Sequence, residues 1–283
     1  MKLLIVGCGD LGGRVARLAL GRGDQVLGVR RDPGRVPAGV EPIRGDVGEA
    51  ASLVFPSGID AMIYSVAASE RTDAGYRRAY PQGLSHAIEA LDRSSPGAHV
   101  VFVSSTAVYG ENGGRWVDEE TLPFPTRFQG VRMAEAEAVL AKRGRGTSLR
   151  LAGIYGPGRT RLIETVRSGS FDSRPAVRQW TNRIHVDDAA RALLHVVDLH
   201  LGGEPVPGIL NGVDAEPAIR EDVLAFLAQR LGMPPATPGL ADEESRPFSN
   251  KRVRGDRLRG SGFEVRYPSF REGYDALLEI TGK

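Results

Sequence analysis

Three glycines near the start of the chain have the spacing of a nucleotide-binding turn. Gly7, Gly9 and Gly12 form the pattern G-x-G-x-x-G in the stretch IVGCGDLGGRVARL. Glycine permits a tight turn and lets backbone amides approach a pyrophosphate at the positive end of a helix. Because an apolar run precedes the pattern and an amphipathic one follows it, we predict dinucleotide binding rather than an ordinary glycine turn. We interpret Cys8 as a residue small enough to fit the turn.

Two arginines after the next apolar run bear on the choice of cofactor. Arg30 and Arg31 stand in LGVRRDPGR, where an NAD-specific protein would carry an acid for the ribose hydroxyls. Guanidinium groups suit a 2′-phosphate, so we predict NADP in preference to NAD. Asp32 keeps the NAD alternative open, because a shift of one residue would bring its carboxylate near the ribose. Asp46, in RGDVGE, could cap a loop or accept a hydrogen bond from the adenine amino group.

An alternation of short apolar runs with helical patterns would position these residues. The runs that predict buried strands are rich in branched residues and cover 2–6, 25–29, 60–66, 99–103 and 147–153. Helical patterns lie between them, with Leu11, Val15 and Leu18 on one face, and again over 81–92 and 131–143. The alternation predicts an α/β Rossmann-type fold, a doubly wound parallel sheet with helices on both faces.

The pattern loosens after about residue 154, which indicates a second, smaller part of the chain. The stretch 232–262 is rich in Pro, Gly and Arg and shows no clear periodicity. The division that we expect is an NADP-binding Rossmann domain over 1–153 plus about 185–213, and a small C-terminal substrate lobe over about 154–184 plus 214–283. We expect this lobe at the carboxyl edge of the sheet, where such folds bind ligands.

Charge and cysteine content limit the partners and the compartment. The 37 basic and 35 acidic residues leave a net charge of +2, so no global field recruits nucleic acid or an anionic membrane. A single cysteine excludes an internal disulfide and fits a reducing compartment. The apolar start MKLLIVGC is too short for a secretory signal. We therefore predict a cytoplasmic protein without membrane or nucleic-acid partners, and leave a homodimer open.

Further motifs follow the glycine turn in order: SSTAVYG (104–110), LRLAGIYGPGR (149–159), RIHVDDAARAL (183–193) and the closing NKRVRGDRLRGSGFEVRYPSFREGY. With them the chain resembles the extended short-chain dehydrogenase/reductases, the NAD-dependent epimerase/dehydratase-like proteins, over nearly its whole length. The glycine turn has one residue fewer between its first two glycines than is usual there, as in atypical members. The resemblance implies an NAD(P)-binding Rossmann domain and a small substrate lobe.

The family's chemistry uses a Ser or Thr that hydrogen-bonds the reacting oxygen, a Tyr that moves its proton, and a Lys one helical turn later. The Lys holds the nicotinamide ribose and lowers the Tyr pKa. Ser105 matches the hydroxyl position, and Thr106 is the neighbour that could substitute. The Tyr and Lys positions fall on Phe128 and Arg132, in RFQGVRMAE. Phenylalanine cannot exchange a proton, whereas arginine stays charged and can still bond the cofactor.

Other side chains complete the expected site. We assign Asp10, Leu11, Val47, Ala67, Ala68 and Arg132 to the cofactor as well. In the resembling family the small lobe contacts the anionic part of the substrate, so we expect substrate contacts from Tyr155, Arg183, Lys251 and Arg252. Tyr109 and Tyr155 are weak candidates for the missing acid, because each is more often a packing residue. We interpret His185 as structural, and we predict no metal, because the histidines lack the spacing of metal ligands.

Three functions remain open from the sequence. The first is an NAD(P)-binding oxidoreductase or epimerase-like enzyme that acts on an anionic sugar-like or nucleotide-sugar substrate through a non-standard proton donor. The second is a catalytically silent NADP-binding sensor or regulatory protein. The third is a structural or nucleic-acid-associated scaffold, motivated only by the basic run from Arg246 to Arg259. That run is more typical of a solvated face, because Phe248 is its only aromatic residue.

Overall fold

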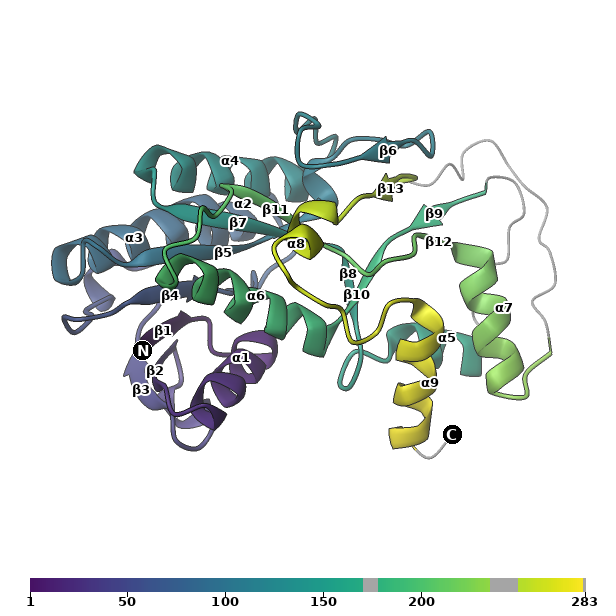
Figure 1. Ribbon diagram of the computed structural model, residues 1–283, viewed down its shortest axis with the longest axis horizontal. Coiled ribbons are helices and arrows are strands. Elements are labelled where there is room, and N and C mark those ends of the chain that lie inside the picture. The colour runs from purple at the N-terminus through teal and green to yellow at the C-terminus, as the bar shows by residue number, and fades with distance from the viewer. Residues whose placement is uncertain (170–177, 235–248, 282–283) are drawn as a thin grey trace. The chain divides into compact units, whose positions relative to one another are not determined.

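The computed structural model describes residues 1–169, 178–234 and 249–281. Its central feature is a seven-stranded parallel sheet in the order β11-β7-β5-β4-β1-β2-β3 (Figure 1). The strands are β1 (Lys2–Val6), β2 (Gln25–Arg30), β3 (Glu41–Arg44), β4 (Ala61–Tyr64), β5 (His99–Ser105), β7 (Gly146–Leu151) and β11 (Ile209–Gly212). The α/β Rossmann-type fold predicted from the sequence is therefore confirmed.

Burial of β1 on both faces explains its uninterrupted apolar sequence. It lies between β2 and β4, and Leu3 pairs in register with Val26 on one side and Ala61 on the other. The run Leu3–Val6 is fully buried. A central parallel strand covered by helices on both faces needs apolar residues at successive positions, not at alternate ones. All five predicted strands form, and their ends differ from the predicted ones by at most two residues.

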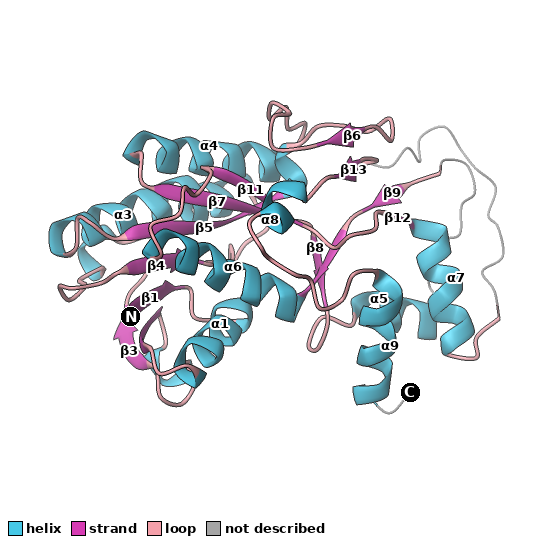
Figure 2. Ribbon diagram, in the orientation of Figure 1, coloured by secondary structure: helices cyan, strands magenta, loops and turns pink. Residues whose placement is uncertain are grey.

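The helices of the sheet domain form two layers. They are α1 (Asp10–Gly21), α3 (Gly83–Ser94), α4 (Phe128–Arg143) and α6 (Val186–Leu201), with the short α2 (Asp73–Arg77) and a π-helical turn, η3 (Arg78–Gln82), before α3. An ion pair between Arg22 and Asp198 joins the end of α1 to α6, on the side of the sheet opposite to α3 and α4 (Figures 1 and 2).

One detail of the α1 prediction is wrong. The sequence placed Leu18 on the buried face of the helix with Leu11 and Val15, but Leu18 is 41% exposed. Leu11 and Val15 are buried as predicted, and the rest of the buried face consists of the small residues Gly12, Gly13, Ala16 and Ala19. Small side chains there let the helix approach the sheet closely, and this turns Leu18 toward solvent.

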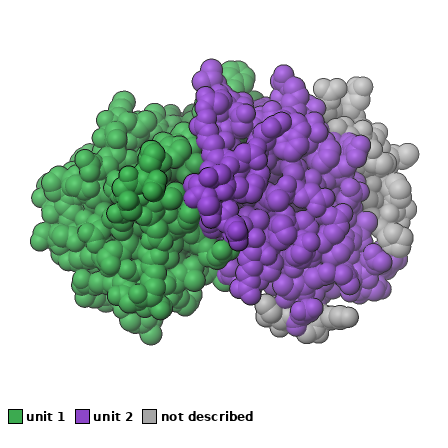
Figure 3. All heavy atoms as spheres, viewed as in Figure 1, with its two compact units in different colours: residues 1–109, 123–150, 189–210 green, residues 110–122, 151–188, 211–283 purple. Residues whose placement is uncertain are grey.

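The chain divides into two compact units (Figure 3). Unit 1 consists of Met1–Tyr109, Pro123–Arg150 and Ala189–Leu210, and unit 2 of Gly110–Leu122, Leu151–Asp188 and Asn211–Lys283. The sequence analysis assigned Gly110–Leu122 to the nucleotide-binding domain, whereas the structure places it in unit 2. The physical reason is a strand pairing, since β6 (Trp116–Val117) pairs in parallel with β13 (Arg252–Val253).

Unit 2 is built from short strand pairs and helices around its own core. β8 (Gly153–Tyr155) pairs with β10 (Arg183–His185), and β9 (Trp180–Thr181) pairs with β12 (Ala218–Ile219). Its helices are α5 (Arg161–Arg167), α7 (Arg220–Arg230), α8 (Asp256–Gly260) and α9 (Phe270–Thr281). The core contains Tyr155, Ile163, Val166, Leu227, Phe270, Tyr274 and Leu277. Within the described ranges, no helix has both the length and the apolar character needed to cross a membrane.

Candidate dinucleotide and active site

The three glycines of the turn between β1 and α1 differ in what surrounds them, so glycine is present at each position for a different physical reason. Gly7 has a φ of +89°, and a Cβ there would lie 2.6 Å from the amide nitrogen of Val66. A Cβ on Gly12 would lie 2.6 Å from the carbonyl oxygen of Gly7, so this glycine lets α1 pack against the turn. A Cβ on Gly9 would meet only the Gly7 oxygen, at 3.9 Å. The space beside Gly9 is therefore open to a ligand.

The first turn of α1 can receive an anion. No side chain caps the helix, whose N-cap is Gly9, so the amide groups predicted to approach a pyrophosphate, those of Asp10 and Leu11 among them, belong to an uncapped helix start. Cys8 is fully buried, and burial raises the pKa of its thiol. This residue fills space below the turn, as the sequence suggested.

The two arginines after β2 differ in their surroundings. Arg30 donates hydrogen bonds to the carbonyl oxygens of Cys8, at 3.2 Å, and Arg35, at 2.9 Å, so its guanidinium lies against the glycine turn. Arg31 is exposed. The carboxylate of Asp32 accepts a hydrogen bond from the Gly34 amide at 3.2 Å and caps a short 3₁₀ turn. The one acid of this segment is therefore engaged in its own turn.

The loops after β3 and β4 carry the other predicted cofactor residues. Asp46 accepts a hydrogen bond from the Gly48 amide at 2.8 Å and faces Arg78 at 3.4 Å, so it caps its loop. The Val47 carbonyl lies 2.8 Å from Nδ1 of His86. Ala67 and Ala68 follow β4, and the Ala68 amide lies 3.5 Å from the Tyr80 hydroxyl. The loop that contains them adjoins the glycine turn, because Ser65 donates a hydrogen bond to the Gly7 oxygen at 3.1 Å.

The predicted catalytic hydroxyls lie at the carboxyl end of β5. Ser105 ends the strand, and its Oγ accepts a hydrogen bond from the Ala107 amide at 3.1 Å. Thr106 begins a short 3₁₀ turn and is buried. The first turn of α4 packs directly on this segment, since a Cβ on Gly130 would lie 2.3 Å from the Ala107 carbonyl oxygen by ideal geometry. The segment that follows Ser105 thus packs against the start of α4.

A buried network of charged and polar side chains contacts β5 through Ser104. Arg150 donates to both oxygens of Glu137, at 2.9 and 2.7 Å, and to the Tyr109 hydroxyl at 2.8 Å. Ser104 donates to Glu137 at 2.5 Å. The four residues are all buried. Because the Tyr109 hydroxyl accepts a charge-assisted hydrogen bond in this network, its contacts are those of a positioning residue.

Phe128 and Arg132 lie one helical turn apart on α4, as their spacing predicts. The Phe128 ring meets the Tyr76 ring edge-on, with centroids 5.4 Å apart. Arg132 donates two hydrogen bonds to the Asp73 carboxylate, each of 2.8 Å, and one to Glu135 of 2.5 Å. The guanidinium is thereby fixed between two carboxylates.

Sequence reasoning did not identify Asp73, Tyr76 or Tyr80 as part of this region. The signal available was weak, because the segment ERTDAGYRRAYPQG looks like an irregular charged stretch. The structure makes it α2 followed by the π-helical turn, and both pack against α4. Side chains of α2 therefore contact α4 although the two helices are far apart in sequence. Asp73 and Arg132, for example, are separated by 59 residues.

Unit 2 contains the predicted substrate contacts. Lys251 is buried, donates to the Ser249 hydroxyl at 3.0 Å, and has its pKa lowered by burial to about 8, against the opposing attraction of Glu111. The Arg252 guanidinium lies between the rings of Trp116 and Trp180, 5.0 Å from each centroid. Of the basic run from Arg246 to Arg259, the structure describes residues 249–259, whereas Arg246 and Phe248 lie outside the described residues.

The remaining predicted residues of unit 2 are deep in its interior. Arg183 is buried and donates to the Thr181 hydroxyl at 2.8 Å. Tyr155 is in the core, its hydroxyl donates to the Ser269 carbonyl at 3.4 Å, and burial raises its pKa. The ring of His185 packs on Tyr155 with centroids 5.4 Å apart, which agrees with a structural role. Substrate contact by Tyr155 or Arg183 stays a prediction.

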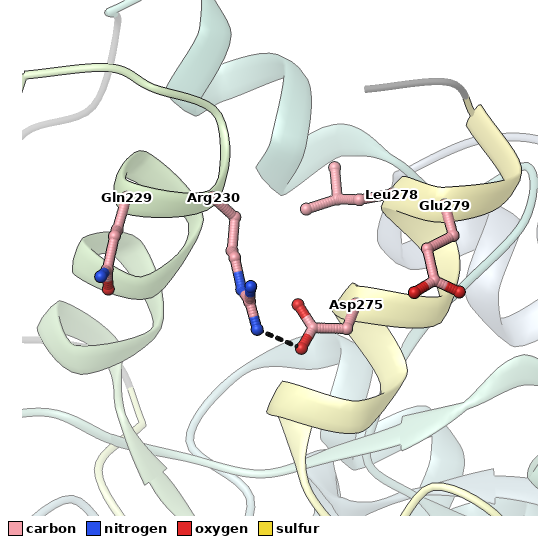
Figure 4. Close-up of a pocket in the computed structure, with 5 residues that line it drawn as sticks. All are labelled: Gln229, Arg230, Asp275, Leu278 and Glu279. Atoms are coloured by element: carbon pink, nitrogen blue, oxygen red, sulfur yellow. Dashed lines mark hydrogen bonds and ion pairs between the residues drawn. The ribbon is translucent and has the colours of Figure 1, made fainter.

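A surface hollow of about 410 Å³ lies between α7 and α9 of unit 2 (Figure 4). Its lining includes an ion pair of 2.6 Å between Arg230 and Asp275, with Gln229, Leu278 and Glu279 around it. None of the predicted site residues lines it. Across the described ranges, no group of three or more His, Cys, Asp or Glu side chains is arranged to hold a metal ion.

Comparisons with known proteins agree with this geometry. Residues 3–209 match the model of the NAD dependent epimerase/dehydratase family. A protein of Methylobacillus flagellatus, provisionally described as an NAD-dependent epimerase/dehydratase, is 37% identical, with 100% of this chain and 99% of that chain covered and a TM-score of 0.83. A conserved protein of unknown function from Silicibacter pomeroyi is 29% identical over 99% of this chain and 98% of that chain, with a TM-score of 0.77.

More distant structures share the fold. MoeE5, in complex with UDP-glucose and NAD, is 24% identical over 100% of this chain and 99% of that chain, with a TM-score of 0.82. No curated protein matches the sequence significantly. The family match spans most of the chain and includes the glycine turn, the Ser105 segment and α4. The chain therefore belongs to the NAD dependent epimerase/dehydratase family.

Proposed function

We propose that the chain is an NADP-dependent oxidoreductase or epimerase that acts on an anionic sugar-like or nucleotide-sugar substrate. The glycine turn carries the cofactor part of this proposal. It combines an uncapped helix start with open space at Gly9, while Gly7 and Gly12 are crowded by protein atoms. This is the arrangement that a pyrophosphate requires. A bound nicotinamide would supply or accept the hydride.

The preference for NADP rests on the end of β2. Arg31 is exposed there, and Arg30 lies against the turn. The carboxylate of Asp32 is engaged with the Gly34 amide, so this acid is not directed at a ribose. The distant structural neighbour MoeE5 holds NAD, and the arginines are the reason to expect a different choice in this chain.

The substrate part rests on Ser105 and on the cations of unit 2. Ser105 can polarise a substrate oxygen from its position at the end of β5. Lys251 and Arg252 provide positive charge for an anionic group, and MoeE5 holds UDP-glucose, a ligand with such a group. We propose that Phe128 and Arg132 occupy the positions of the family's Tyr and Lys. Arg132 can still contact the cofactor, although Asp73 and Glu135 compete for it. Cytoplasmic location and dimerisation stay predictions.

The test is turnover with UDP-glucose, UDP-galactose and UDP-N-acetylglucosamine, each offered with NADP or NADPH. Oxidation or reduction appears as a change in nicotinamide absorbance, and epimerisation appears by chromatographic analysis of the products. We expect cofactor-dependent conversion of at least one sugar nucleotide. Ser105→Ala should abolish this conversion, whereas Ser105→Thr, which keeps a hydroxyl at this position, should retain it. No conversion in either assay would contradict the enzyme proposal for these substrates.

A silent NADP sensor is the second candidate, and the inert Phe128 ring favours it. In that case NADPH would bind and no sugar nucleotide would be converted. A change of protease sensitivity on NADPH binding would then identify a conformational response. The two functions are thus separated by the turnover assay on protein that has been shown to bind the cofactor.

A further inference from the structure

Two side-chain contacts join α2 to α4 at the place of the family's Tyr and Lys. Arg132 holds the Asp73 carboxylate through two hydrogen bonds of 2.8 Å. The Tyr76 ring meets the Phe128 ring at 5.4 Å with an interplanar angle of 89°. Asp73 and Tyr76 are three residues apart on α2, and Phe128 and Arg132 are four apart on α4, so the two contacts are neighbours on the helix surfaces. α2 therefore brings a phenol ring next to the inert ring of Phe128.

Aromatic rings continue from this contact toward the glycine turn. Tyr76 and Tyr80 have ring centroids 5.1 Å apart. The Tyr80 hydroxyl lies 3.5 Å from the Ala68 amide, in the loop that follows β4. That loop contacts the glycine turn through Ser65 and Gly7. The rings thus lead from the predicted dinucleotide turn to α4 within unit 1.

At the other end, the row of rings reaches the first turn of α4, which packs against the segment that follows Ser105. Phe128 begins α4, and Gly130 in the same helical turn packs against the Ala107 carbonyl, two residues after Ser105. Tyr76 thus lies on a residue at the start of α4, and the backbone after Ser105 packs against that same turn. Both groups that the reaction needs, a hydroxyl to polarise the oxygen and an acid to donate a proton, are available from neighbouring elements.

The backbone between the two tyrosines is unusual. Arg78–Gln82 forms a π-helical turn that contains Pro81. Proline lacks the amide hydrogen that a regular helix would use, and a π turn accommodates such an interruption. Single π turns inside helical segments occur frequently at functional sites. Here the turn lies between Tyr76 and α3, and it packs against α4.

The hydroxyls of the two tyrosines are in different situations. That of Tyr80 is within hydrogen-bonding range of the Ala68 amide, and burial raises its pKa. Tyr76 is half-buried, and its hydroxyl forms no hydrogen bond with any residue that the structure describes. Of the two phenols, Tyr76 is therefore the one whose hydroxyl is available for hydrogen bonding to a ligand or to water.

We propose that the hydroxyl of Tyr76 is the proton-transfer group of this chain, presented from α2 in place of a tyrosine at position 128. This inference rests on the proposed oxidoreductase or epimerase function. In the reducing direction, Tyr76 donates its phenolic proton to the carbonyl oxygen while the carbonyl carbon receives a hydride, so that an alcohol forms. The resulting phenolate regains a proton from water. In the oxidising direction, the phenolate accepts the alcohol proton as the hydride leaves.

The primary test compares single hydroxyl deletions. Tyr76→Phe keeps the ring and its contact with Phe128, and Tyr267→Phe is a matched control, because Tyr267 is also half-buried and its hydroxyl has no hydrogen bond within the described chain. We expect Tyr76→Phe to lower turnover by roughly 10²- to 10⁴-fold, with NADPH affinity and thermal midpoint unchanged. Tyr267→Phe should retain wild-type turnover. The double variant Tyr76→Phe/Phe128→Tyr, which returns the phenol to α4, should recover part of the lost turnover.

A second readout does not depend on activity. The chain has seven tyrosines, and uniform 3-fluorotyrosine labelling gives one ¹⁹F resonance for each, with that of Tyr76 assigned from the Tyr76→Phe spectrum. Saturating NADP should move the Tyr76 resonance and leave that of Tyr274, in the core of unit 2, in place.

The outcomes separate this proposal from the proposed function. Two results would overturn the role of Tyr76 if the protein binds NADPH saturably. One is a Tyr76 resonance that does not move on binding, and the other is wild-type turnover in Tyr76→Phe. In either case the cofactor proposal would stand. Loss of turnover in Tyr80→Phe but not in Tyr76→Phe overturns the role of Tyr76 too. A wild-type chain that binds NADPH and converts no substrate of the panel contradicts both proposals. A chain that binds neither NADPH nor NADH contradicts the proposed function at its first step.

Discussion

The ring of Tyr76 on α2 meets the ring of Phe128 on α4 edge-on, with centroids 5.4 Å apart and planes at 89°. One turn further, Asp73 on α2 holds Arg132 on α4. Each of the two unusual residues on α4 is therefore matched by a partner on α2. In this contact between the two helices, α2 contributes the carboxylate and the phenol, and α4 contributes the cation and the inert ring.

The glycine turn gives a prediction that separates binding from folding. Gly9→Ala adds a Cβ where only one protein atom lies within 4 Å, so the thermal midpoint should stay unchanged. NADPH affinity should fall by about tenfold or more, equivalent to about 1.4 kcal/mol, because the Cβ occupies the phosphate's space. Gly12→Ala is the contrasting variant, since its Cβ would overlap the turn, and it should destabilise the fold by roughly 1–3 kcal/mol. Equal effects of the two variants on stability would contradict this assignment.

The buried network behind Ser105 predicts strong coupling between two charges. Glu137→Leu leaves Arg150 buried without its carboxylate and should lower the free energy of unfolding by about 3–5 kcal/mol. The double variant Glu137→Leu/Arg150→Met removes both charges and should be clearly more stable than the single one. Urea unfolding of Glu137→Leu, Arg150→Met, the double variant and the wild type measures the coupling. Additive effects of the two substitutions would show that the pair is not coupled.

The extent to which the fold could be predicted depends on where each strand lies in the sheet. The interior strands were recognised because both of their faces are buried, which leaves an uninterrupted apolar run. β3, with the sequence EPIR, and β11, with ILNG, were missed. Both are edge strands of four residues, and such strands need few apolar side chains and tolerate proline. The Leu18 error has a related cause, because glycine and alanine can form a buried helix face without an apolar signal.

His99 predicts the pH dependence of stability. The residue is buried, its ring stacks on His200 at 3.8 Å, and burial with the nearby cations lowers the pKa of His99 to about 3. The unfolded chain binds a proton at this histidine below its ordinary pKa of about 6.5, whereas the folded chain does not until about pH 3. The free energy of unfolding should therefore decrease as pH falls below about 6.5, by up to about 1.4 kcal/mol per pH unit for this proton.

The measurement is urea unfolding of wild type and His99→Gln at several pH values from 5 to 8. The stability of wild type relative to the variant should shrink as the pH is lowered, because glutamine does not titrate. If the free energies of unfolding of the two proteins changed in parallel with pH over this range, His99 would not contribute to the pH dependence of stability.

Lys251 predicts a pH dependence of anion binding. Burial lowers its pKa to about 8, so the ammonium group that would hold an anionic substrate is lost as pH rises through that value. The dissociation constant of UDP should increase between pH 7 and pH 9, as measured by calorimetry. Lys251→Arg, which stays charged, should flatten this dependence. The same pH dependence in both proteins would exclude Lys251 as its source.

The site could be predicted only in part, because some of its contacts join residues that are far apart in the sequence. The glycine turn, Ser105 and the helical spacing of Phe128 and Arg132 are local patterns. The partners of Arg132 and Phe128 are not local, since Asp73 lies 59 residues earlier, and only the packing of α2 on α4 brings them together. The burial of Tyr155 and the capping role of Asp32 likewise follow from the fold and have no signature in the sequence.

The most direct test of the account is a fluorescence titration of the purified protein with NADPH and with NADH at equal ionic strength. We predict saturable binding with NADPH preferred by about tenfold or more, as expected for a charge-assisted contact to the 2′-phosphate. Arg31→Ala, which removes an exposed side chain, should narrow that preference without changing NADH affinity. Absence of saturable binding by either cofactor would contradict the central claim that this chain is a nicotinamide-dinucleotide enzyme.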